Sequence, residues 1–172
     1  SFSYGGHVCE IPAEALLSFA VPFRHVPALE LVGLPNGNSN AYRPLLGLEG
    51  AHTVVRGTLR YPAYMGVMRA AVDLGLLAEK AADVPPAGAA GQPLEALVRK
   101  GVAARAKAVE HLASTCAGLT AYLKGSGGVA PGDSPEKVVS GLRELGLEAL
   151  IREVQAGAVA NPREEFVRRS EE

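Results

Sequence analysis

Apolar residues recur at helical spacing in two segments of the chain, 63–76 and 104–123. The apolar stripes consist of Tyr64, Val67, Met68 and Ala71 in the first segment and of Leu112, Cys116, Leu119 and Leu123 in the second. The spacing is i, i+3, i+4, i+7 in the first segment and i, i+4, i+7, i+11 in the second, and it predicts two helices, each of which turns one face to a core. Gly125 is placed to end the second helix.

Two further helices are predicted toward the C-terminus. Ser134 followed by Pro135 is typical of an N-cap with proline at the first helical position. The inward positions are Val138, Leu142 and Leu145 in this helix, and Leu147, Leu150, Ile151 and Val154 in a last short one. The simplest interpretation of all four stripes is that they face the core of surface helices.

Two strands are predicted in the N-terminal part. The apolar run 28–34 ends at Pro35, and the run 53–61 alternates between apolar and polar residues. In the second run, one face carries Val55 and Leu59 and the other carries Arg56, Thr58 and Arg60. We expect the apolar face to cover a core and the Arg-Thr-Arg face to point outward.

The chain divides by texture into a mixed part, 1–77, and a helical remainder, 78–172. Pro- and Gly-rich composition predicts flexible loops at 83–93 and 125–133 within the remainder. We therefore expect an α+β fold: a small mixed or antiparallel sheet, helices packed on one side of it, and a helical C-terminal part.

The composition of the chain excludes several classes of function. With 172 residues, 48% hydrophobic content and a formal net charge of -1, the chain can form a core and is unsuited to gripping nucleic acid as its main partner. Two cysteines, Cys9 and Cys116, favour a reducing compartment over a disulfide-stapled domain. The scattered cysteines and histidines do not have the spacing of a metal site, and no apolar run is long enough for a membrane helix. The N-terminus lacks the features of a signal peptide.

The strand 53–61 is the strongest candidate for ligand binding. Arg56 and Arg60 would lie roughly 13 Å apart along a strand, and their guanidinium groups could bind two carboxylates of one elongated ligand. The hydroxyl of Thr58 would lie between them. An exposed strand face with solvated arginines is the equally weighted alternative.

Two glycine-containing segments need separate interpretation. The turn 35–40 contains Asn-Gly and further Asn and Ser side chains that can bond local backbone or a ligand, although most such turns are only turns.

The segment 125–130 fits the loose G-x-G-x-x-A form of a dinucleotide fingerprint. Because a predicted helix precedes it and Pro-Gly follows it, we interpret it as a linker.

The order of three motifs resembles the saccharopine dehydrogenase family. They are Pro35-Asn36-x-x-Ser39, the string Thr-Val-Val-Arg-Gly-Thr-Leu-Arg-Tyr at 53–61, and a helix that ends in Leu-Gly-Leu-Leu at 74–77. The family typically shows PNRDS, RGTLRY and a similar helix end. The segment 6–17 resembles the strand and turn upstream of these motifs, and 134–147 resembles a later helix of the family.

The resemblance implies a domain that binds saccharopine and packs against a Rossmann domain carrying NAD or NADP. It suggests that Asn36, Ser39, Arg56, Thr58 and Arg60 lie at or beside the substrate cleft, and it assigns no general base. The chain departs from PNRDS at Gly37 and Asn38, which replace an arginine and an aspartate. The dinucleotide-binding half of the family is not recognisable in these residues.

We therefore predict the substrate-side domain of an NAD(P)-dependent saccharopine dehydrogenase of lysine metabolism, inactive alone because the cofactor needs the absent Rossmann half. The ligand would be saccharopine or another multi-carboxylate amino acid, without a metal, and the Rossmann partner would act in cis or in trans. The alternative is a non-catalytic structural or interaction subunit derived from such an enzyme. The expected compartment is the cytoplasm, with the mitochondrial matrix as the alternative.

Overall fold

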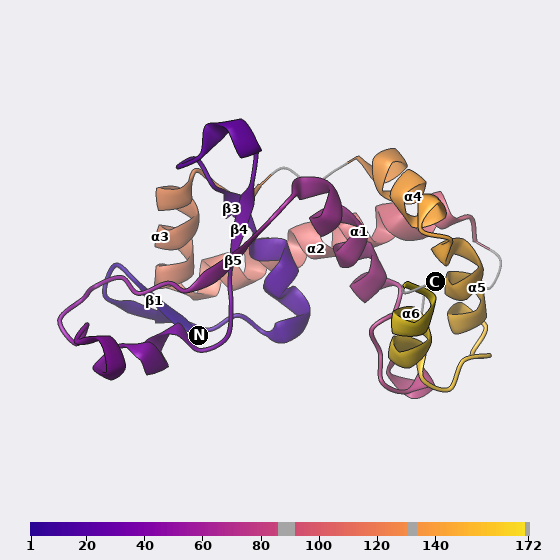
Figure 1. The fold of residues 1–172 in the computed structure, drawn as a ribbon, viewed down its shortest axis with the longest axis horizontal. Helices are drawn as coiled ribbons and strands as arrows, with labels where there is room; N and C mark the ends of the chain where they lie inside the picture. Colours follow the sequence, from indigo (N-terminus) through magenta and orange to yellow (C-terminus); the bar gives the residue numbers. More distant parts are fainter. Residues whose placement is uncertain (86–91, 131–133, 171–172) are drawn as a thin grey trace. The chain divides into compact units, whose positions relative to one another are not determined.

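The computed structural model describes residues 1–85, 92–130 and 134–170. The strands are β1 (Phe2–Tyr4), β2 (His7–Cys9), β3 (Val21–Pro22), β4 (Val32–Pro35) and β5 (Gly57–Arg60) (Figure 1). The α-helices are α1 (Pro62–Asp73), α2 (Leu94–Thr115), α3 (Ala117–Ser126), α4 (Pro135–Glu144), α5 (Leu147–Gln155) and α6 (Pro162–Ser170). Short 3-10 helices are η1 (Ala13–Phe19), η2 (Pro27–Leu29), η3 (Ser39–Tyr42), η4 (Pro44–Leu46) and η5 (Ala81–Asp83).

The chain folds into two compact units. The sheet unit consists of Ser1–Pro62 and Arg105–Pro131, and the helical unit consists of Ala63–Ala104 and Gly132–Glu172. Each unit therefore combines segments from both texture regions of the sequence. The division at residue 77 remains a prediction about sequence character, whereas the α+β fold with small antiparallel sheets and a helical C-terminal part is confirmed.

The sheet unit contains two small antiparallel sheets, β1-β2 and β3-β4-β5. A single bridge between Ser3 and Val54 connects the first hairpin to the segment before β5. Helix α3 packs against β1 and β2 (Figure 1). The core between them contains Phe2, Cys9, Phe19, Val21, Leu119 and Tyr122. This apolar cluster holds the β1-β2 hairpin against α3.

The register of β5 corrects the expected orientation of its faces. Leu34 pairs with Thr58 and Val32 pairs with Arg60, and directly opposed residues share a face of the sheet. Because Val32 and Leu34 are buried, the Thr58 and Arg60 face is the one that β4 turns toward the core. Leu59 is 41% exposed on the other face, so the prediction of a buried apolar face on this strand is wrong.

The predicted strands are also longer than the observed ones. Strand β5 begins at Gly57, and Val54 pairs with Ser3 of the other sheet. Strand β4 begins at Val32, because Pro27–Leu29 form η2 and Glu30 ends it in the left-handed region with a φ of 44°. Proline at the start of a helical turn and a left-handed residue after it both interrupt an extended run.

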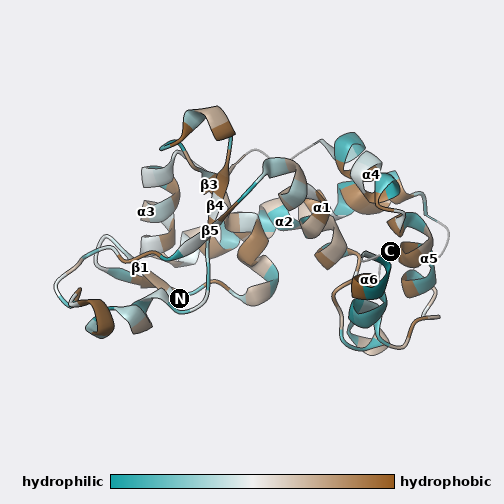
Figure 2. Ribbon diagram, in the orientation of Figure 1, coloured by the Kyte–Doolittle hydropathy of each residue, from teal (hydrophilic) through white to brown (hydrophobic). Residues whose placement is uncertain are grey.

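The helical unit has its own core, formed by one face of each of several helices. Its buried residues are Ala70, Ala71, Leu74, Leu76, Leu94, Val98, Val138, Val139, Leu142, Leu147, Leu150, Ile151 and Val154. Figure 2 shows that α4 and α5 carry hydrophobic and hydrophilic residues on different sides (Figure 2). The predicted cap is confirmed, because Ser134 accepts a hydrogen bond from the Lys137 backbone N–H and Pro135 opens α4.

Two helix predictions need correction. The segment 104–123 is not one helix, because α2 ends at Thr115 and Cys116 is extended, with φ −129° and ψ 106°. The Ser114 and Thr115 hydroxyls donate to carbonyls of the preceding turn, which favours an end to the helix at this point. Helix α6 was not predicted, because its sequence is mostly charged; ion pairs from Arg169 to Glu153 and Glu165 hold it.

The predicted loops fall partly outside the described residues. Of 83–93, Asp83 ends η5 and residues 86–91 lie outside the described part. Of 125–133, the first two residues belong to α3, Gly127 caps that helix, and residues 131–133 lie outside the described part.

Candidate functional site

The backbone of Arg56 is held from two sides by the turn that follows β4. The Arg56 N–H donates to the Ser39 hydroxyl at 2.9 Å, and the Asn36 N–H donates to the Arg56 carbonyl at 2.9 Å. Ser39 is completely buried and also bonds through its own N–H to the Ser1 carbonyl. These hydrogen bonds therefore fix the backbone position from which the Arg56 side chain extends.

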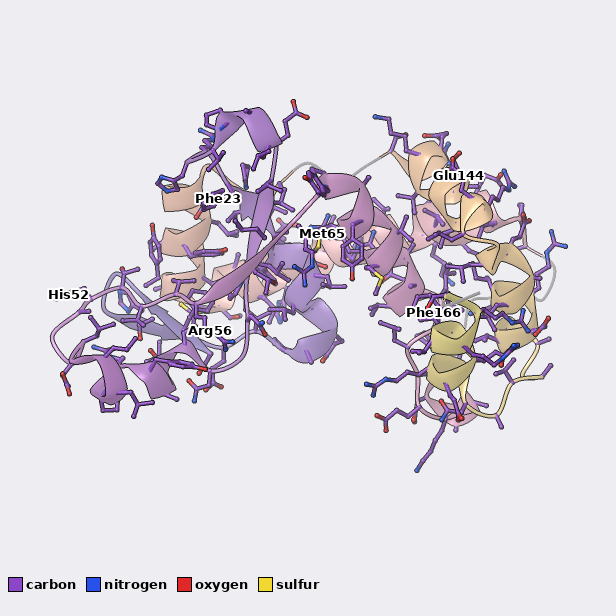
Figure 3. The ribbon with its side chains drawn as sticks, viewed as in Figure 1. Phe23, His52, Arg56, Met65, Glu144 and Phe166 are labelled. Carbon is purple, nitrogen blue, oxygen red and sulfur yellow. The ribbon has the colours of Figure 1, made fainter. Side chains whose placement is uncertain are left out.

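The side chain of Arg56, labelled in Figure 3, is exposed. Its guanidinium lies over the Tyr42 ring, with 5.1 Å between its central carbon and the ring centroid. A stacked guanidinium keeps its N–H donors in the plane of the fork, where they can bind a carboxylate in bidentate fashion. A Cβ at Gly37 would lie 3.6 Å from Arg56 Nη1. Tyr42 and the turn at Gly37 thus border the space in which this guanidinium lies.

Thr58 and Arg60 lie further along β5. Thr58 is half-buried opposite Leu34, and Arg60 is exposed at the end of the strand, where its Nη1 donates to the Leu59 carbonyl at 2.8 Å. At about 3.3 Å per residue, Arg56 and Arg60 start roughly 13 Å apart. The structure therefore brings Asn36, Ser39 and Arg56 into direct contact and places Thr58 and Arg60 along the strand from them.

The side chain of Asn38 stabilises the 35–40 turn itself. Asn38 is the N-cap of η3, and its Oδ1 accepts from the N–H groups of Asn40 and Ala41 at 3.1 and 3.3 Å. Gly37 has a φ of 61°, a conformation that glycine adopts without strain. Asn38 supplies the capping acceptor that an aspartate would supply, so this departure from the PNRDS pattern preserves the local structure.

Sequence reasoning missed two residues around this site, Tyr42 and Arg43. Arg43 donates to the Ser3 hydroxyl at 3.2 Å and to the carbonyls of Glu49 and Ala51 at 2.8 Å each. It thereby holds the loop after η4 against β1. Neither residue belongs to a periodic pattern or a motif in the sequence. Only their contacts in the structure show that they belong to this site.

Other site types find no support in the part of the chain that the structure describes. No group of three or more His, Cys, Asp or Glu side chains there could hold a metal ion. In the same residues, no helix has the length and apolar character needed to cross a membrane.

Comparisons with known proteins identify relatives of this chain. The family described as the saccharopine dehydrogenase C-terminal domain matches residues 1–134. Alpha-aminoadipic semialdehyde synthase, mitochondrial, of Rattus norvegicus is 40% identical over 63 residues, which are 37% of this chain and 7% of that protein. Saccharopine dehydrogenase [NADP(+), L-glutamate-forming] of Schizosaccharomyces pombe is 25% identical over 146 residues, 85% of this chain and 31% of that protein.

A solved structure shows the same relationship. Apo saccharopine dehydrogenase (L-Glu forming) from Saccharomyces cerevisiae superposes with a TM-score of 0.51 and 26% sequence identity, over 85% of this chain and 31% of that one. The chain thus spans less than a third of the length of each of these relatives. It belongs to the saccharopine dehydrogenase family and corresponds to the C-terminal domain of that family.

Proposed function

We propose that this chain is the substrate-side domain of an NAD(P)-dependent saccharopine dehydrogenase, and that Arg56 and Arg60 bind carboxylates of saccharopine. Membership of the family supports the substrate class. Two cations about one strand length apart match a ligand that carries several carboxylates.

The observation that carries this proposal is the arrangement of Arg56. Hydrogen bonds from Asn36 and to Ser39 fix its backbone, while its guanidinium stays exposed and stacks on Tyr42. A preorganised, exposed guanidinium loses less entropy when it binds a carboxylate than a mobile side chain would. Asn36 and Ser39 then contribute by positioning Arg56, and the Thr58 hydroxyl lies on the strand between the two arginines.

We infer that oxidation of the substrate needs a second domain. Hydride transfer requires a nicotinamide cofactor held against the reacting carbon, and relatives carry NADP(+) in their names. In this proposal a dinucleotide-binding domain outside these residues holds NAD or NADP, in cis or in trans, and the isolated chain is inactive. A cytoplasmic enzyme is our first expectation; the name of the rat relative, which includes "mitochondrial", supports the matrix as the second.

Isothermal titration calorimetry with saccharopine tests the binding role directly. We expect the purified chain to bind saccharopine, and Arg56→Ala to weaken binding about tenfold to a hundredfold, because one charge-assisted contact is lost. Arg60→Ala should have an effect of similar size. Glutamate and aminoadipate, each with fewer carboxylates, should bind more weakly than saccharopine.

Arg152→Ala is the matched control, because it removes one exposed arginine from the helical unit, where its partner is Glu148 at 2.7 Å. Saccharopine affinity should be unchanged in this variant. Equal affinity of wild type and Arg56→Ala, with both proteins folded, would contradict the proposed site.

A non-catalytic interaction subunit is the second candidate, and the exposed apolar positions around β5 favour it. Val55, Leu59 and Tyr61 are 39%, 41% and 61% exposed. If the chain serves as a scaffold for another protein, Leu59→Asp should abolish co-purification of that partner, and calorimetry should detect no saccharopine binding. Saccharopine binding that depends on Arg56 would contradict this candidate.

A further inference from the structure

Two cysteines that are far apart in the sequence meet inside the sheet unit. Cys9 ends β2, and Cys116 lies between α2 and α3. Both are free thiols, and Cys116 is one of the groups whose proximity raises the pKa of Cys9. Cys116 also belongs to the side chains that pack against the core containing Cys9.

The surrounding backbone brings the two residues together. A Cβ on Gly118, two residues after Cys116, would lie only 2.5 Å from Cys9 Sγ. From the other side, Cys116 Sγ lies 4.0 Å from the carbonyl of Val8, the neighbour of Cys9. The first turn of α3 is therefore packed directly on β2, and the extended backbone of Cys116 places its side chain at this contact.

The two thiols differ in accessibility. Cys9 is completely buried, whereas Cys116 is half-buried. Burial and the neighbouring Cys116 thiol together raise the pKa of Cys9 to about 11. An oxidant in solution therefore meets Cys116 first, and Cys9 is protected from direct attack and from modification beyond the disulfide.

We propose that Cys9 and Cys116 are a redox modification site that closes to a reversible disulfide when the chain meets a peroxide. The Cys116 thiolate attacks one oxygen of hydrogen peroxide, the O–O bond breaks, and Cys116 sulfenic acid and hydroxide form. Cys9 Sγ then attacks the Cys116 sulfur, the S–O bond breaks, and the Cys9 proton leaves with the hydroxyl as water. Two thiols are oxidised and one peroxide is reduced to two molecules of water.

This inference is independent of the proposed saccharopine site. The bond would tie the β1-β2 hairpin to the junction of α2 and α3, two segments with more than a hundred residues between them. Disulfides in reducing compartments are usually transient and redox-sensing, which agrees with two free thiols that share one packed contact.

The experiment uses the reduced full chain, treated with a small excess of hydrogen peroxide, then alkylated under unfolding conditions and digested for mass spectrometry. We expect a cross-linked peptide pair containing Cys9 and Cys116, loss of both alkylated forms, and complete recovery of both after dithiothreitol. The oxidised monomer should melt roughly 5 to 10 °C higher than the reduced one.

Two variants separate the steps. In Cys9→Ala, Cys116 sulfenic acid should persist and react with dimedone, because no resolving thiol is present. In Cys116→Ala, Cys9 should remain alkylatable only after unfolding and should not react with dimedone. The proposal would be overturned if peroxide-treated wild type retains two free thiols or forms only intermolecular dimers through Cys116. This result counts against the proposal whatever the two variants show.

Discussion

The hydroxyl of Ser39 connects the 35–40 turn to the candidate ligand-binding side chain. It is completely buried and accepts the backbone N–H of Arg56 at 2.9 Å. Removal of a buried acceptor leaves its donor unsatisfied, which costs more than the net value of one hydrogen bond. Ser39 therefore affects both the stability of the sheet unit and the position of Arg56.

We predict that Ser39→Ala lowers the free energy of unfolding by about 1 to 3 kcal/mol, measured by urea denaturation. Saccharopine affinity should fall in the same variant, because Arg56 is less well fixed. The control is Ser114→Ala, which removes an exposed hydroxyl that bonds only within the last turn of α2, with an expected change within about 0.5 kcal/mol. If Ser39→Ala also changes the free energy of unfolding by no more than about 0.5 kcal/mol, the Ser39 hydroxyl does not stabilise the sheet unit as proposed.

Tyr122 gives a prediction for alkaline pH. Its burial, with a smaller contribution from Tyr4, raises its pKa from 10.0 to about 12. The folded state thus favours the neutral phenol, so this contribution to stability is fully present below pH 10 and is lost as the pH rises through 12.

The measurement is an ultraviolet titration of tyrosinate in wild type and Tyr122→Phe. The difference between the two curves should show one phenol that ionises near pH 12 or on unfolding. Tyr61→Phe, which removes an exposed phenol, is the control for the loss of one tyrosine. If the Tyr122 difference curve has its midpoint near 10, the phenol is hydrated and this interpretation of its environment is wrong.

At the scale of elements, periodic segments were predictable and segments governed by tertiary contacts were not. The sequences of α1, α4 and α5 carry an apolar stripe or an explicit cap, so local chemistry is enough to predict that they are helices. The predicted inward positions Tyr64 and Leu145 are wrong, because both side chains are exposed. Helix α6 has no apolar stripe that marks it in the sequence, although Asn161 caps it by accepting the Glu164 N–H at 3.1 Å, and its ion pairs to α5 do not show in a one-dimensional pattern.

The sheet shows the same limit. Alternation predicted correctly that residues 57–60 are extended and that Thr58 and Arg60 share a face. It could not show which face is buried, because the register with β4 decides that. Family resemblance alone suggested that Asn36 and Ser39 lie at the same cleft as Arg56, and neither their hydrogen bonds to Arg56 nor the ring of Tyr42 beside it was predicted.

The junction between β2 and α3 yields a prediction for packing. Gly118 lies in α3, where alanine would raise helix propensity, but its missing side chain is the space that Cys9 Sγ occupies. We expect Gly118→Ala to destabilise the chain by about 1 to 3 kcal/mol in urea, because overpacking outweighs the gain in propensity.

Gly50→Ala is the matched control, because a Cβ there would meet no atom within 4 Å. It should leave the stability unchanged or raise it by a few tenths of a kcal/mol, through reduced freedom of the unfolded chain. A stabilising Gly118→Ala would show that α3 can move away from β2 at little cost, and would weaken the case for the Cys9–Cys116 contact.

At the scale of the whole molecule, the chain has two separate apolar cores. One lies around Phe2, Phe19 and Tyr122 in the sheet unit, and the other around Leu142 and Leu150 in the helical unit. The candidate residues from Asn36 to Arg60 all belong to the sheet unit. Damage to the helical core therefore offers a way to test whether the sheet unit holds its structure by itself.

Leu150→Ala is the variant for that test, because Leu150 is fully buried in the helical core. Truncation of a buried leucine costs about 2 to 5 kcal/mol through lost burial and a residual cavity. If the units are separately cooperative, hydrogen-exchange mass spectrometry should show faster exchange in peptides from Ala63–Ala104 and Gly132–Glu172, and unchanged exchange in β1 to β5. Leu45→Ala, at a residue that is 76% exposed, should change neither set. Faster exchange across all peptides of Leu150→Ala would instead mean that the two cores unfold together, in which case the stability of the Arg56 site depends on the helical unit as much as on its own sheet.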